Sequence, residues 1–309
     1  MQYSVIIPAY NESESLKLLW QELIVAMKKL DAPWEAIIVD DGSTDTSPDI
    51  LKNLTNTHAE MYVIRFSKNR GKAAALQAGF DAAKGKTIIT LDADLQDDPA
   101  EIGRLIEKLN AGYDLVTGYK INRQDPIHKT VPSYFFNKLI RILSGVPVRD
   151  INSGLKAYRQ PVIKQVRIYG DLHRFIPILA HADGFRVTEI DVNHRPRQFG
   201  KSKYGMGRFT RGLLDIVTVT FLTRFLKRPL HLFGGVGLVF LGIGLVSSIY
   251  LSVLHFAYGQ SIGNRPLLLL GILLILAGIQ LISTGLIAEL VTYYLQRPSN
   301  QPNSLKQRE

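Results

Sequence analysis

Residues 87–99 read TIITLDADLQDDP, a short apolar run rich in β-branched residues that ends at once in carboxylates. Such a run predicts a buried strand, here over Thr87–Asp92. Four similar runs in the first half of the chain predict further strands, at Ser4–Pro8, Glu35–Asp40, Met61–Phe66 and Asp114–Thr117.

The segments between these strands repeat apolar residues at helical spacing. They predict helices over Glu12–Leu30, Ser47–Asn56, Lys72–Ala83 and Asp98–Asn110. Strands and helices that alternate in this way predict an α/β fold with a Rossmann-like, mainly parallel sheet covered on both faces. Such sheets bind ligands beyond the carboxyl ends of their strands, and the polar clusters of this sequence follow strand ends.

The C-terminal part of the chain is almost free of charge. The 309 residues carry a net charge of +10, yet Arg265 is the only formal charge between Pro229 and Ala288. Two apolar stretches, Leu230–Ala257 and Pro266–Ala288, are each longer than the roughly 20 residues that a membrane-spanning helix needs. They predict a transmembrane hairpin, because buried helices of a soluble core rarely stay uncharged over that length.

Basic residues flank the predicted hairpin on both sides, at Arg224, Lys227, Arg228, Arg297, Lys306 and Arg308. The positive-inside rule then places the soluble domain and both termini in the cytoplasm, beneath an inner or plasma membrane. The segment Gly207–Leu226 predicts an amphipathic helix at the membrane surface, with a soluble helix as the alternative. The expected divisions are a catalytic domain at 1–204, the surface-helix region at 205–228, the hairpin at 229–296 and a basic tail at 297–309.

The amino-acid composition limits which binding partners and site types are possible. The chain has no cysteine, which excludes disulfides and zinc–thiolate sites. Its positive charge favours an anionic partner, and the basic residues beside the apolar segment favour lipid and phosphorylated substrates over nucleic acid. No cleavable signal peptide is expected at the N-terminus. Glycines such as Gly234 and Gly244 would permit helix packing in a homo-oligomer, or are ordinary membrane residues.

The acidic cluster after the strand predicts a metal site. Carboxylates two residues apart on an extended segment point the same way, so Asp92 and Asp94 would face one cleft. Hard oxygen ligands suit Mg²⁺ or Mn²⁺ together with substrate phosphates. A D-x-D pair alone can also be two solvated turn residues.

Three motifs that follow predicted strands make the pattern specific: IIPAYNE at 6–12, VDDGSTD at 39–45 and LDADLQDDP at 91–99. Together they resemble the family-2 glycosyltransferases of the GT-A fold. The closest resemblance is to the polyprenyl-phosphate glycosyltransferases, which include dolichol-phosphate mannose synthase and bacterial GtrB-like enzymes. It extends over the whole chain, through NSGLKAYR, HRPRQFGKSKYG and the two C-terminal spans.

The resemblance implies roles for individual acidic and neutral residues. The nucleoside pocket would include Pro8, Tyr10, Glu12 and Asp41, with Asp40 beside it; the structural alternative for the aspartates is a turn and helix cap. The metal would be held by Asp92, Asp94 and Gln96. Asp150 would lie near the acceptor, as a general base or as an orienting group, or would only cap the NSG turn.

The resemblance also implies phosphate-binding cations. Lys72 begins a helix after a glycine and would contact phosphate, or would be a solvated first-turn residue. Lys120, Arg123, His128 and Lys129 would meet phosphate from an irregular loop, or would belong to a plain surface loop; the subgroup often has arginine where Lys120 stands. The lipid phosphate would be held by a basic loop with Arg195, Arg197, Ser202 and Lys203; the alternative is a run of charges that faces water.

The implied activity is inverting transfer of a sugar from a nucleotide donor to a polyprenyl phosphate. UDP-glucose and undecaprenyl phosphate are the favoured pair; GDP-mannose or a UDP-aminosugar is the alternative. A processive polysaccharide synthase is disfavoured, because the chain lacks a Q-x-x-R-W motif and has few spans. A non-catalytic membrane scaffold would have no reason to keep polar clusters after three strands.

Overall fold

The computed structural model describes residues 1–120, 141–142, 144–170, 172–193, 195–196, 217–225, 228–263 and 265–296. The chain forms two compact units, Met1–Thr223 and Arg224–Glu309. The division falls inside the 205–228 region that the sequence assigns to a surface helix. Each unit is described by itself.

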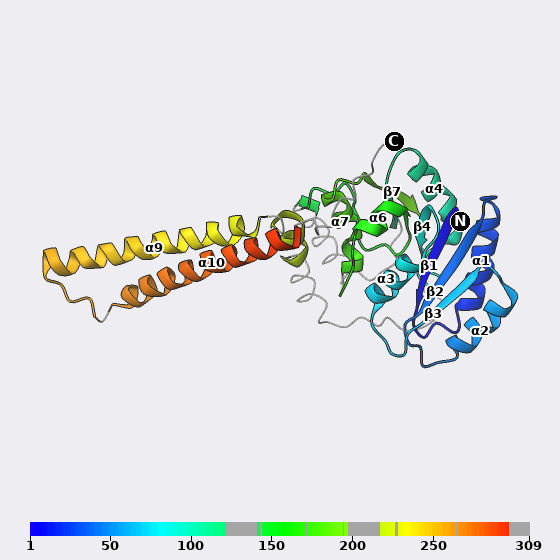
Figure 1. Cartoon of the computed structure of the whole chain (residues 1–309), viewed down its shortest axis with the longest axis horizontal. Helices are drawn as coiled ribbons and strands as arrows, with labels where there is room; N and C mark the ends of the chain where they lie inside the picture. The colour runs from blue at the N-terminus through cyan, green and yellow to red at the C-terminus, as the bar shows by residue number, and fades with distance from the viewer. Residues whose placement is uncertain are drawn as a thin grey trace, which may run out of the picture. The chain divides into compact units, whose positions relative to one another are not determined.

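The first unit is built on a seven-stranded sheet (Figure 1). Its strands, in sheet order, are β3 (Met61–Arg65), β2 (Trp34–Asp40), β1 (Tyr3–Ala9), β4 (Thr87–Thr90), β6 (Lys156–Arg159), β5 (Leu115–Lys120) and β7 (Val187–Val192). Only β6 runs against the others among the described strands, since it pairs antiparallel with both β4 and β5. The mainly parallel α/β sheet is therefore confirmed.

Helices cover both faces of the sheet because the strands are apolar on both sides. In β1, Val5 and Ile7 face one apolar cluster and Ile6 faces the other. The first cluster includes residues of α1 (Leu16–Lys28), α2 (Ser47–Thr57) and α4 (Ile102–Asn110), which follows the short η1 (Pro99–Glu101). The second includes residues of α3 (Lys72–Ala82), α6 (Gln160–Gln165), η2 (Leu172–Phe175) and α7 (Ile176–Ala182). Figure 1 shows α3 and α1 on opposite sides of the strands.

The second unit is a pair of long helices, α9 (Pro229–Tyr258) and α10 (Pro266–Gln296). Both are long and apolar enough to cross a membrane, and only 17% and 11% of their most apolar windows are buried. Core helices of a soluble protein would be mostly buried, so these helices favour membrane association. The two helices touch through glycines: a Cβ on Gly237 would lie 2.8 Å from the Gly278 carbonyl oxygen, and one on Gly244 would lie 2.7 Å from that of Gly271.

Several predicted segments lie outside the described residues. They include most of Tyr134–Leu143, the loop 121–129, the basic loop from residue 197 onward, residues 205–216 and the tail at 297–309. The predicted surface helix Gly207–Leu226 is described only from residue 217 to 225, where a helical turn continues into the π-helix η3 (Phe221–Phe225).

Candidate active site

Two of the motif loops are joined to each other at the carboxyl edge of the sheet. Strands β1 and β2 run in parallel register, with Ala9 opposite Asp40. Beyond them, the main-chain N–H of Asn11 donates to Ser43 Oγ at 2.9 Å, and that of Glu12 donates to Ser47 Oγ at 3.0 Å. Pro8 lies one residue before the end of β1 and Tyr10 follows the strand, so the predicted nucleoside-pocket residues of β1 lie beside those of β2.

Asp40 and Asp41 are buried and organise the loop around them. Asp40 Oδ1 accepts from the Ser43 N–H at 2.8 Å. Asp41 accepts from two successive main-chain N–H groups, Arg70 at 2.7 Å and Gly71 at 2.9 Å. These bonds tie the VDDGSTD turn to the loop that begins α3. The contact of Asp41 with a base or ribose remains a prediction, while its structural role is shown.

The acidic turn after β4 differs from the sequence-based expectation. The strand ends at Thr90, and Asp92–Asp94 enters a turn in which Leu95 has a φ of 61°. Asp94 Oδ1 accepts from the Gln96 N–H at 3.2 Å within that turn. The extended geometry predicted for the D-x-D pair is therefore wrong, because the strand stops before Asp92 and Asp94 lies in the turn.

Asp92 lies between a lysine and a glycine. The Lys72 ammonium is 2.6 and 2.7 Å from the two carboxylate oxygens of Asp92. Gly154 lies so close to the same carboxylate that an added Cβ would be 2.5 Å from the Asp92 carboxyl group. Lys72 is thus paired with the first aspartate of the motif and is not merely a solvated first-turn residue.

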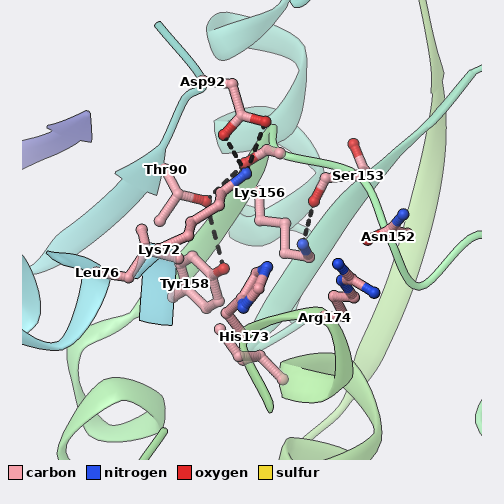
Figure 2. Close-up of a pocket in the computed structure, with 12 residues that line it drawn as sticks. Lys72, Leu76, Thr90, Asp92, Asn152, Ser153, Lys156, Tyr158, His173 and Arg174 are labelled. Atoms are coloured by element: carbon pink, nitrogen blue, oxygen red, sulfur yellow. Dashed lines mark hydrogen bonds and ion pairs between the residues drawn. The ribbon is translucent and has the colours of Figure 1, made fainter. Parts of the chain in front are cut away.

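A small pocket opens beside this ion pair (Figure 2). Its walls come from α3, β4, the turn before β6, β6 itself and η2. The lining residues are Lys72, Leu76, Thr90, Asp92, Asn152, Ser153, Gly154, Lys156, Tyr158, His173, Arg174 and Ile176.

Lys156, His173 and Arg174 were not predicted as site residues. Lys156 is 4% exposed, and its ammonium donates to the Ser153 carbonyl oxygen. Burial lowers the pKa of Lys156 to about 8, and repulsion from Lys72 adds to that shift, whereas attraction to Asp92, Asp150 and Asp97 opposes it. The sequence signal for Lys156 is the alternation within KAYR of the NSGLKAYR motif. On a strand, this alternation places Lys156 and Tyr158 on the same side of β6.

The imidazole of His173 is also buried in this pocket, with an exposure of 8%. Burial lowers its pKa to about 2, and the charges of Lys72, Arg174 and Lys156 act in the same direction, while a hydrogen bond to the Gly170 main chain opposes them. The ring is therefore neutral at physiological pH. Its Nδ1 atom has no hydrogen-bond partner in the described part of the chain.

Asp150 is buried in the turn that leads to β6. Its Oδ1 accepts from the Asn152 N–H at 3.0 Å, which is the capping contact expected of a turn aspartate. The preceding Arg149 binds Glu189 and Asp191 of β7 and lies 3.8 Å from the Tyr119 ring centroid. The turn is thus fixed in place, and the role of Asp150 towards an acceptor remains a prediction.

Two further predicted phosphate-binding cations contact residues 96–98, which follow the acidic turn and are called the acidic loop here. The ammonium of Lys120 is 3.6 Å from Asp97 Oδ1. Arg195 donates from its main chain to the Gln96 carbonyl oxygen, and its guanidinium pairs with Glu22 at 2.8 Å and Asp98 at 2.7 Å. The structure therefore gives Arg195 a role in holding this loop; binding of lipid phosphate stays a prediction. Arg123, His128, Lys129, Arg197, Ser202 and Lys203 lie outside the described residues.

Comparison with known proteins agrees with this fold. The profile of the family described as "Glycosyl transferase family 2" matches residues 4–167. A relative from Rhizobium johnstonii named dodecaprenyl-phosphate galacturonate synthase is 37% identical, over 98% of this chain and 91% of its own. A relative from Aeromonas hydrophila named undecaprenyl-phosphate 4-deoxy-4-formamido-L-arabinose transferase is 37% identical, over 93% and 87%. The chain belongs to glycosyltransferase family 2 and is a glycosyltransferase.

Solved structures show the same fold. The glucosyl-3-phosphoglycerate synthase of Mycobacterium tuberculosis, crystallised with phosphoglyceric acid, has a TM-score of 0.55 at 17% identity and covers 72% of this chain and 79% of its own. A crystal of that enzyme with Mn²⁺, UDP-glucose and phosphoglyceric acid gives 0.55 at 16% identity, with the same coverage. At this identity the likeness establishes the GT-A fold alone.

Replacing Gly154 with alanine should displace Asp92. The added Cβ would lie 2.5 Å from the carboxyl group, so either the carboxylate or the turn must move. We expect glycosyl transfer to fall by at least about tenfold, since a misplaced catalytic-site group costs that much or more. Gly103→Ala is the matched control, because its Cβ would meet nothing closer than Leu30 at 3.9 Å. Equal activities of the two variants would contradict this interpretation.

Replacing His173 with glutamine should make the fold less sensitive to acid. The folded-state pKa lies below the unfolded value of 6.5, so the unfolded chain gains a proton first as pH falls, and stability is lost below about pH 6.5. At pH 5 the loss from this group is on the order of 2 kcal/mol. Urea unfolding in detergent, followed by the fluorescence of Trp20 and Trp34, measures it at pH 7 and pH 5. The decrease in the free energy of unfolding between pH 7 and pH 5 should be smaller in His173→Gln than in the wild type, and should be unchanged in the control His181→Gln.

Proposed function

We propose that the chain transfers a sugar from a nucleotide donor to a polyprenyl phosphate, with the acidic turn after β4 as the catalytic centre. The observation that carries this proposal is the placement of Asp92 between Lys72 and Gly154 at the carboxyl edge of the sheet. Two relatives that align over nearly the whole chain are named for transfer to dodecaprenyl or undecaprenyl phosphate. The apolar hairpin fits an acceptor whose tail lies in a membrane.

A divalent cation fits this centre. Asp92, Asp94 and Gln96 offer only oxygen donors, and in the described chain no group of three His, Cys, Asp or Glu side chains forms a complete metal cage. Mg²⁺ and Mn²⁺ suit such an incomplete set, because they commonly bind one or two carboxylates plus substrate phosphates. When bound, the cation would neutralise charge on the departing diphosphate.

The side chains of this site then bring two anions together. A phosphate monoester has a second pKa of about 6, so the acceptor oxygen is already nucleophilic near neutral pH and needs no strong base. That oxygen forms a bond to the anomeric carbon while the bond from this carbon to the diphosphate oxygen breaks. Lys72 would contact a donor phosphate, and Asp150 would orient the acceptor. A single displacement of this kind inverts the anomeric configuration.

This proposal is tested with a panel of labelled nucleotide sugars. The panel includes UDP-glucose, which is the donor that the sequence favours. The two curated relatives are named for galacturonate and for 4-deoxy-4-formamido-L-arabinose. The panel therefore combines undecaprenyl phosphate and Mg²⁺ or Mn²⁺ with labelled UDP-glucose, UDP-uronates, UDP-aminosugars and GDP-mannose. Label in the lipid phase supports the proposal, and no labelled lipid with any donor contradicts it.

Asp94→Asn should abolish most activity without unfolding the chain. Removing one anionic ligand weakens the metal site, and we expect transfer to fall by about 100-fold or more. Chelation of divalent ions should have the same effect on the wild type, reversed by added Mg²⁺ or Mn²⁺. Asp183→Asn, on the exposed end of α7, is the matched control and should leave transfer unchanged. Activity that survives both Asp94→Asn and chelation would refute the metal-dependent centre.

We also propose that the hairpin spans the membrane with the sheet domain in the cytoplasm. Because the chain has no cysteine, one introduced cysteine reports its own location. Ser261→Cys, between α9 and α10, should react with an impermeant maleimide in intact cells. Asn53→Cys, exposed on α2, should react only after permeabilisation. Labelling of Asn53→Cys in intact cells, or protection of Ser261→Cys, would contradict this orientation.

A further inference from the structure

We infer that the pocket formed by Lys156, His173 and Arg174 binds a carboxylate on the transferred sugar, so that the donor is a nucleotide-linked uronate. This inference rests on the proposed function and adds the substrate class to it. It replaces the glucose that the sequence favours.

Lys156 provides the main reason. Its ammonium is buried, and in the described part of the chain its only hydrogen-bond acceptor is the neutral Ser153 carbonyl. Asp92 lines the same pocket but is held by Lys72 at 2.6 Å. A buried cation without a carboxylate in contact is unfavourable, and an anionic group entering the pocket would relieve it.

The other two side chains fit the rest of a sugar acid. Figure 2 shows the nitrogen-bearing ends of Lys156, His173 and Arg174 gathered in the pocket next to the Lys72–Asp92 pair. Arg174 adds a second positive charge with planar, paired donors that match a carboxylate. The contact with the Gly170 main chain favours the His173 tautomer protonated on Nε2, and its buried Nδ1 then offers a lone pair to a sugar hydroxyl.

The location distinguishes a sugar carboxylate from the donor diphosphate. Lys72 starts α3 after Gly71 and lies at the rim with Asp92, where phosphates and a cation would bind. Lys156 lies deeper, because the whole residue is only 4% exposed, whereas the side chain of half-buried Lys72 is 32% exposed. The cation at the rim thus suits the diphosphate, and the buried one suits a substituent of the sugar.

Donor pairs that differ only at C6 test the inference directly. We would measure kcat/KM for UDP-glucuronate against UDP-glucose, and for UDP-galacturonate against UDP-galactose, with undecaprenyl phosphate as acceptor. The full-length wild type should prefer at least one uronate over its matched hexose by at least about tenfold, because a site built for a polar group rejects analogues that lack it. Lys156→Met should lower uronate kcat/KM by about tenfold or more and leave hexose values within about threefold.

Two controls separate charge recognition from other effects. Lys164→Met makes the same change on the exposed side of α6 and should alter neither donor. Binding of UDP alone, measured by calorimetry, should be the same in the wild type and Lys156→Met. Weaker UDP binding in Lys156→Met, or an equal loss for uronate and hexose, would assign Lys156 to the diphosphate and overturn the inference.

The wild-type comparison stands even if Lys156→Met does not fold. Transfer of hexoses as fast as uronates, or faster, would overturn the uronate pocket and leave the proposed function intact. Transfer of no nucleotide sugar to the lipid would refute the proposed function and this inference together.

Discussion

The ion pair between Lys72 and Asp92 is the contact on which the arrangement of the site depends. It joins the start of α3 to the turn after β4, and Gly154 packs closely against the same carboxylate. Three segments far apart in the sequence therefore meet at one aspartate. They can do so because the parallel strands β1, β2 and β4 end at the same edge of the sheet, while antiparallel β6 begins there.

The other buried carboxylates of this edge build the loops. Asp40, Asp41 and Asp150 each accept main-chain N–H groups, which satisfies buried acceptors and fixes the turns that carry them. Arg195 extends this arrangement, since it links α1 to the acidic loop through Glu22 and Asp98. A site that holds two anions close together needs such fixed positive and polar groups, because flexible ones would have to reorganise during the reaction.

The sequence predicted the first five strands and the four long helices between them, because their apolar residues alternate or repeat at regular spacing. It did not predict β6 or β7. Lys156 occupies a buried position of β6, and lysine normally indicates an exposed one. In β7 the acidic Glu189 and Asp191 interrupt the apolar pattern, and their partner Arg149 is 40 residues away in sequence from the nearer of them. The turn at Asp94 was missed because left-handed Leu95 carries no sequence signal of the kind that glycine gives.

The pocket also differs from the rest of the first unit in the kind of side chain that it buries. Elsewhere, the buried apolar side chains form two well-defined clusters, and buried carboxylates such as Asp40 and Asp41 accept main-chain hydrogen bonds. In the pocket, a lysine with a lowered pKa lies beside a histidine whose Nδ1 has no partner among the described residues. Methionine at position 156 would fill similar volume without the desolvation penalty, so the lysine is not explained by stability. A ligand carboxylate accounts for both residues, because in the bound state the ammonium, whose acceptor among the described residues is the neutral Ser153 carbonyl, gains an anionic partner and the imidazole nitrogen gains a donor.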